Sequence, residues 1–149
     1  MSVHRVSTSG PIRPSALPIR HAADALRIVG AMLSDPPREE LACLLLDEER
    51  RGDVTFLVSD TPDEAILDVT SLILGVAAGA GVSGVVLASH RPGRGHLPQS
   101  ADCERCAMLI DTLADAGVAL VDWFIVDRGL AASVPELSGR PSAWIPAKH

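Results

Sequence analysis

The chain has 149 residues, enough for one domain with a substantial hydrophobic core. Hydrophobic residues make up 47% and charged residues 21% of the sequence, which is typical of a folded globular domain and excludes a disordered chain. The formal net charge of −6 disfavours binding to the polyanionic backbone of nucleic acids. Three cysteines without a secretory signal predict reduced thiols and a cytoplasmic location.

The N-terminal third is expected to hold a flexible tail, a helix and a hairpin. Residues 1–20 contain three prolines and no acidic residue, which predicts the tail. An apolar stripe at helical spacing predicts a helix over 21–34, ended by the prolines that follow. A nearly continuous apolar run predicts a buried strand over 40–47, and a second strand over 54–59 completes the hairpin.

The middle of the chain contains a well-marked helix start and a glycine-rich turn. Thr61 as N-cap and Pro62 in the first turn predict a helix that runs to about residue 78. A turn over 79–84 and a buried strand over 85–89 follow. The turn matches G-x-G-x-x-G, but the dinucleotide fingerprint needs a strand before it and a helix after it, so no nucleotide cofactor is expected. Residues 69–89 are uncharged, but their glycines predict a helix, a turn and a strand rather than a membrane span.

The last third is predicted to contain a helix over 102–116, a strand over 118–126 and a short strand over 130–134. The domain then spans residues 21–136, and 137–149 form a C-terminal tail. The alternation of helices and strands predicts an α/β fold in three layers, in which helices flank a mixed β-sheet.

The loop over 89–102 carries the residues that suggest chemistry. Ser89 and His90 are neighbours at a strand end, so their side chains point to opposite faces and cannot form a nucleophile–base pair. Arg91 and Arg94, with the histidines at 90 and 96, form a basic cluster. We interpret it as solvated loop charge, with anion or nucleic-acid binding through Arg91 and Arg94 as the alternative.

Two cysteines follow this loop in a single C-x-x-C motif. Cys103 and Cys106 are predicted to pack on one face of the helix as small apolar groups. The alternative is a rearranged zinc site, since zinc prefers cysteine, histidine and carboxylate ligands. Its candidate ligands are His90, His96, Asp102, Cys103 and Cys106.

Residues 38–134 resemble the C-terminal domain of the RadC family, a branch of the JAB/MPN metalloprotease-like fold. The family loop reads His-x-His-Pro-Ser-Gly-x-x-x-Pro-Ser-x-x-Asp, and Pro92, Pro98 and Asp102 match its two prolines and its aspartate. The resemblance implies a JAB/MPN-like, cytidine-deaminase-like fold. In the family, both histidines and the aspartate bind zinc, and a glutamate on an earlier strand is the general base.

The zinc ligands are not kept in this chain. Ser89 and Arg91 stand at the two histidine positions, and Gln99 replaces the second serine. The catalytic glutamate matches Glu39, with Glu40 as the alternative. We therefore expect no bound zinc and no catalytic residues, and we expect Arg91 to fill the metal position and pair with Asp102 and Glu39.

These departures predict a non-catalytic interaction or scaffold module whose partner is another protein or a second copy of the chain. Neither nucleic acid nor a membrane is an expected partner. The alternative is a zinc-dependent hydrolase, a metallopeptidase or nuclease-like enzyme, that uses the rearranged ligands named above.

Overall fold

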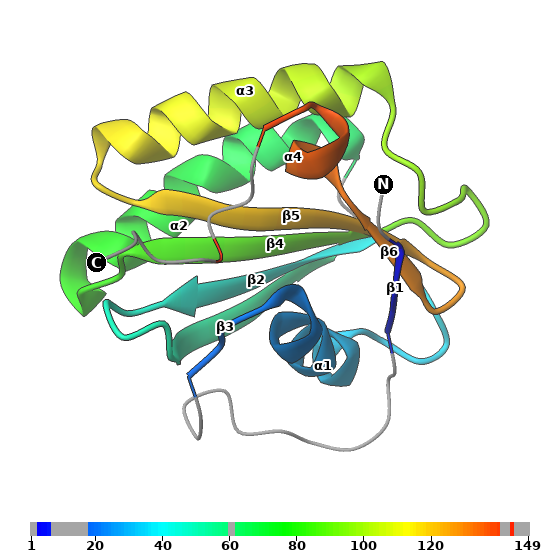
Figure 1. Ribbon diagram of the computed structural model, residues 1–149, viewed down its shortest axis with the longest axis horizontal. Coiled ribbons are helices and arrows are strands. Elements are labelled where there is room, and N and C mark those ends of the chain that lie inside the picture. Colours follow the sequence, from blue (N-terminus) through cyan, green and yellow to red (C-terminus); the bar gives the residue numbers. More distant parts are fainter. Residues whose placement is uncertain (1–2, 7–17, 60–61, 141–143, 145–149) are drawn as a thin grey trace.

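The computed structural model describes residues 3–6, 18–59, 62–140 and 144. These residues form one mixed six-stranded sheet with helices on both faces (Figure 1), which confirms the predicted α/β class. The helices are α1 (Ala22–Met32), α2 (Ile66–Ala80), α3 (Ser100–Asp115) and the single turn α4 (Val134–Leu137).

The strands lie in the order β1-β6-β5-β4-β2-β3 across the sheet. Only β4 and β5 are parallel, and α3 connects them. All other neighbouring strands run antiparallel, including the predicted β2–β3 hairpin. The strands are β1 (Val3–Arg5), β2 (Glu40–Leu46), β3 (Gly52–Ser59), β4 (Gly84–His90), β5 (Ala119–Asp127) and β6 (Leu130–Ser133).

Strand β2 lies between β4 and β3 in the sheet, and every one of its residues is buried. Because successive side chains of a strand point to opposite faces, it contributes to two separate cores. Ala42, Leu44 and Leu46 pack on the face covered by α1. Leu41, Cys43 and Leu45 pack on the face covered by α2 and α3. A strand covered on both faces explains the nearly continuous apolar run in the sequence.

The prediction of a flexible tail over 1–20 is wrong at two places. Val3–Arg5 form β1, which pairs antiparallel with β6 at the edge of the sheet. Ile19 is buried in the core beneath α1. Sequence patterns missed β1 because a three-residue edge strand has too few positions to show an alternation. Residues 7–17 of the predicted tail lie outside the described residues.

The second helical segment begins where the sequence predicted, but its first turn is a 3-10 turn and not an α-helical one. Residues Asp63–Ala65 make a single 3-10 turn, and α2 begins after it at Ile66. The backbone N–H of Ala65 donates to the carbonyl of Pro62 over 3.0 Å, which closes this tight turn. The predicted N-cap, Thr61, lies outside the described residues.

The C-terminal segment is more ordered than a tail. Ser133, predicted to lie in a strand that ran to 134, is the N-cap of α4, and its side chain accepts a hydrogen bond from the Glu136 N–H. Trp144 is buried, and its indole Nε1 donates to Asp122 Oδ2 on β5 over 2.6 Å. Trp144 of the predicted C-terminal tail therefore packs on the domain, and residues 141–143 and 145–149 lie outside the described residues.

The glycine-rich turn connects α2 to β4, in the order helix, turn, strand. Gly81 ends α2 with a left-handed backbone, φ 67°, which glycine adopts without strain. The expected turn is thus confirmed at the G-x-G-x-x-G motif. Within the described parts of the chain, no helix is both long and apolar enough to cross a membrane.

Gly84, at the start of β4, leaves no room for a side chain. A Cβ at this position would lie 2.8 Å from Val121 Cγ2 and 2.7 Å from Arg50 Nη1. Overpacking a core typically costs about 1–3 kcal/mol, so we expect Gly84→Ala to lower the free energy of unfolding by that amount. The control is Gly75→Ala on the exposed side of α2, which has open space and should stabilise by about 0.5–1 kcal/mol. Urea unfolding of both variants measures the difference, and equal effects would contradict this account of Gly84.

Candidate functional site

The loop between β4 and α3 is held in place from the end of β5. The Asp127 carboxylate accepts hydrogen bonds from the backbone N–H groups of Gly93 and Gly95, over 3.0 and 2.8 Å. Burial on its own would raise the pKa of Asp127, but these two N–H donors and nearby cationic groups hold the pKa below its usual value. Both glycines have positive φ angles, 77° and 91°, which let the backbone turn toward the carboxylate.

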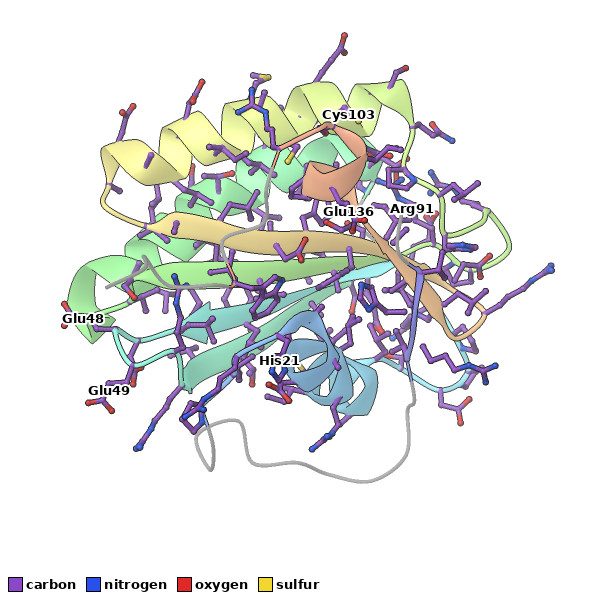
Figure 2. The ribbon with its side chains drawn as sticks, in the orientation of Figure 1. His21, Glu48, Glu49, Arg91, Cys103 and Glu136 are labelled. Carbon is purple, nitrogen blue, oxygen red and sulfur yellow. The ribbon has the colours of Figure 1, made fainter. Side chains whose placement is uncertain are left out.

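Arg91 and Asp102 form a buried, bidentate ion pair at the base of this loop. Arg91 Nη1 lies 2.9 Å from Asp102 Oδ2, and Nη2 lies 2.7 Å from Oδ1. Arg91 is 4% exposed and Asp102 is 1% exposed. Figure 2 shows Arg91 beside the loop that leads to α3. The predicted pairing of Arg91 with Asp102 is therefore confirmed.

Asp102 also anchors the first turn of α3. Its carboxylate accepts from the backbone N–H of the N-cap residue Gln99 over 2.8 Å, and Arg105 lies 3.5 Å away. Burial on its own would raise the pKa of Asp102. The hydrogen bonds from Arg91 and from the Gln99 N–H, together with the charges of Arg91 and Arg105, lower it below the ordinary value of 3.8.

A second layer of ion pairs lies nearer the surface. Arg94 pairs with Glu39, Nη1 to Oε1 over 2.5 Å, and also with Asp63. Asp63 Oδ1 lies 3.3 Å from Arg91 Nε, so this carboxylate joins both layers. We call Glu39, Asp63, Asp102, Arg91, Arg94 and Arg105 the ionic cluster. It contains three carboxylates and three guanidinium groups.

The ionic cluster corrects two expectations from the sequence. Glu39 pairs with Arg94 rather than with Arg91, and Asp63 takes the expected place beside Arg91. The interpretation as solvated loop charge is wrong for Arg91, which is buried. Arg94 is exposed, as that interpretation expects, and it also bridges two carboxylates. These ion pairs engage the guanidinium groups of Arg91 and Arg94, which the alternative of anion binding would need for the anion. Asp63 was missed because an acid at a helix start is fully explained by capping.

Glu39 and Glu40 lie on different faces of the sheet. Glu40 points toward the α1 face, where its carboxylate accepts from Ser34 N and Oγ over 2.6 and 2.8 Å. Glu39 reaches Arg94 on the other face and lines a cavity of about 20 Å³ with Ser89 and Arg91, enough for one water molecule. Glu39, which directly precedes β2, and not Glu40, thus lies on the side of the loop positions named in the resemblance.

The residues at the family's zinc positions do not fit a zinc ion. The Ser89 hydroxyl accepts a hydrogen bond from Trp123 Nε1 over 3.0 Å. Arg91 has no lone pair to offer a metal, and its positive charge opposes a cation beside Asp102. Only Asp102 keeps a ligating group, and a catalytic zinc normally has three protein ligands.

The five alternative ligands are not brought together. His90 is 6% exposed and points to the α1 face, opposite Asp102. Cys106 is buried in the core under α3, and burial raises the pKa of its thiol to about 12, so it is an inert apolar group. Cys103, labelled on α3 in Figure 2, packs against the same core, as the sequence predicted. Within the described ranges, no three histidine, cysteine or acidic side chains are placed to hold a metal ion.

Fold and site together define an α/β domain whose loop between two parallel strands is closed by a buried ion pair. A scan against protein-family models finds no match for this chain, and a search of curated proteins finds none either. The resemblance of residues 38–134 to the RadC family therefore stays a prediction from the sequence.

Replacing Arg91 should destabilise the domain far more than replacing Arg94. In Arg91→Met the Asp102 charge stays buried without its partner, which typically costs about 3–5 kcal/mol. Arg94→Met removes the same group from a half-exposed ion pair, which is worth about 0–1 kcal/mol. Chemical unfolding of the two variants measures the loss of unfolding free energy. Similar losses would show that the buried Arg91–Asp102 pair contributes no more to stability than the exposed pairs of Arg94.

The ion pair also predicts a loss of stability in acid. Because the pKa of Asp102 is lower in the folded state than in the unfolded chain, the unfolded state binds the proton first as pH falls. The stabilisation is present above about pH 4 and is lost as pH falls through the lowered pKa. The difference in unfolding free energy between the native chain and Asp102→Asn should shrink over this range. Asp111→Asn, an exposed position within α3 and outside the ionic cluster, is the control, and its effect on the unfolding free energy should stay within about 0.5 kcal/mol.

Proposed function

We propose that this chain is a RadC-like JAB/MPN domain that has lost its zinc ligands and acts as a non-catalytic interaction or scaffold module. One observation carries the proposal. The buried Arg91 guanidinium is paired with Asp102 at the position where the family's second histidine and aspartate would share a metal ion.

The arrangement of elements supports the family assignment. An early antiparallel hairpin is followed by a helix, a central strand, the loop, and a second helix that leads to a parallel strand. Asp102 lies in the first turn of that second helix, and Glu39 approaches the loop from the hairpin side. These positions agree with what the resemblance implies for Glu39 as the general base and Asp102 as the carboxylate ligand, in a JAB/MPN-like, cytidine-deaminase-like fold.

The chemistry of the ligand positions supports the loss of catalysis. A hydrolytic zinc site needs three protein ligands and an open position, where bound water loses a proton near neutral pH. Arg91 supplies the compensating positive charge for Asp102 but cannot bind or activate water as a metal does. The cation at this place is thus structural. Hydrolysis by the rearranged ligands has no support, since His90 and Asp102 point to opposite faces of the sheet.

A protein partner or a second copy of the chain suits the surface over the ionic cluster. Leu97 is 57% exposed on the same loop, and Arg94 is partly exposed beside it. Such a surface offers a partner one apolar contact and charged groups close together, as in the mixed surfaces of non-obligate interfaces.

The test is to rebuild the lost ligands. Ser89→His/Arg91→His restores two histidines opposite Asp102, and Arg94→His is the control that adds a histidine outside the ligand positions. All three proteins are purified without chelator, and zinc is measured by elemental analysis. We expect close to one equivalent in the double variant and none in the native chain or the control.

Two outcomes would overturn the proposal. Near-stoichiometric zinc in the native chain would favour the hydrolase that uses rearranged ligands. A double variant that folds by circular dichroism and binds no zinc would show that the loop does not correspond to the RadC site. The interaction role is tested on the native chain by light scattering and affinity capture, where a strict monomer with no partner would count against it.

A further inference from the structure

A second cavity lies on the α1 face of the sheet, away from the ionic cluster. Its volume is about 110 Å³, and it sits between the connection that follows α1 and the turn between β5 and β6. Its walls are mainly apolar, and they are formed by Val6, Leu33, Pro37 and Val126. A cavity of about 150 Å³ accepts benzene in a protein core, so this one suits a molecule of at most about six non-hydrogen atoms.

His90 is the buried polar group of this cavity. Its register partners are Glu40 on β2 and Val126 on β5, so the ring lies on the α1 face beneath the 33–37 connection. No described residue forms a hydrogen bond with the His90 ring, and Nδ1 is completely enclosed. Nε2 also has no hydrogen-bond partner among the described residues, and part of its surface is accessible to solvent. Because His90 lines the cavity and Nδ1 is enclosed, Nε2 is the ring atom that a ligand in the cavity can reach.

The charges around the cavity favour an uncharged ligand. Asp35 and Arg128 are exposed at the mouth and have opposite signs, so the entrance does not select an anion or a cation. Inside, the apolar walls would make the burial of an ionised group expensive. A hydroxyl group can either donate to or accept from an imidazole nitrogen, so it suits both neutral tautomers of His90.

We propose that this cavity binds a small uncharged molecule that has an apolar ring or short chain and one hydroxyl group, with the hydroxyl hydrogen-bonded to His90 Nε2. The apolar part lies against Leu33, Pro37 and Val126. The site does not depend on the proposed loss of zinc binding, because it lies on the other face of the sheet.

The experiment uses butan-1-ol, which has five non-hydrogen atoms, as the probe and the full-length native chain. Butan-1-ol is titrated while the ring nitrogens of His90 and the methyl groups of Leu33 and Val126 are followed by NMR. We expect saturable shifts at all three residues. Pentane, which lacks the hydroxyl, and butanoate, which carries a charge, should each bind at least ten-fold more weakly.

Variants locate the site. Val126→Phe fills the cavity and His90→Phe removes the hydrogen-bonding nitrogen, so both should weaken butan-1-ol binding at least ten-fold. Leu57→Phe on the exposed side of β3 is the matched control and should leave binding unchanged. The proposal is overturned by butan-1-ol that causes no saturable shift at His90, by pentane that binds as tightly as butan-1-ol, or by unchanged binding in folded His90→Phe. The shifts in the native chain decide the matter if Val126→Phe does not fold.

Discussion

Arg91 and Asp102 bury two opposite charges together where β4 ends and α3 begins, and the surrounding structure follows from that requirement. Moving a carboxylate or a guanidinium out of water costs several kcal/mol per ion, so neither group is tolerated here without the other. The bidentate geometry fixes the direction of both side chains and thereby the distance between the strand end and the helix start. Asp102 in turn accepts from the N-cap residue of α3, so one carboxylate aligns both loop and helix.

The same electrostatic requirement relates this loop to a metal site. A group of carboxylates near the sheet needs a cation, and either a metal ion or a guanidinium can supply it. The two differ in chemistry, because the metal offers an open coordination position and the guanidinium offers only hydrogen-bond donors. Recruiting Asp63 from the start of α2 gives Arg91 a second carboxylate, and Arg94 neutralises Asp63 and Glu39 toward the surface.

Strand alternation separates two polar environments that are adjacent in sequence. Ser89 and Arg91 belong to the face covered by α2 and α3, and His90 between them belongs to the face covered by α1. Asp127 accepts hydrogen bonds from the backbone N–H groups of Gly93 and Gly95, and this gives the loop a second anchor beside the ion pair. Residues that are adjacent at one strand end can therefore contribute to a structural ion pair on one face of the sheet and to a separate cavity on the other.

Local patterns in the sequence were sufficient to predict the order and type of the main elements, the two-sided burial of β2 and the turn at the glycine motif, because each of these depends on residues close together in the chain. The pairing of Arg91 with Asp102 was predicted from the resemblance to the RadC loop, in which Arg91 stands at a metal-ligand position. The tertiary structure alone decided that Asp63 joins Arg91, that Arg94 takes Glu39, that Val3–Arg5 complete the sheet and that Trp144 binds Asp122. These contacts join segments that are distant in sequence, and their partners are selected by the packing of the whole chain, which no local periodicity encodes.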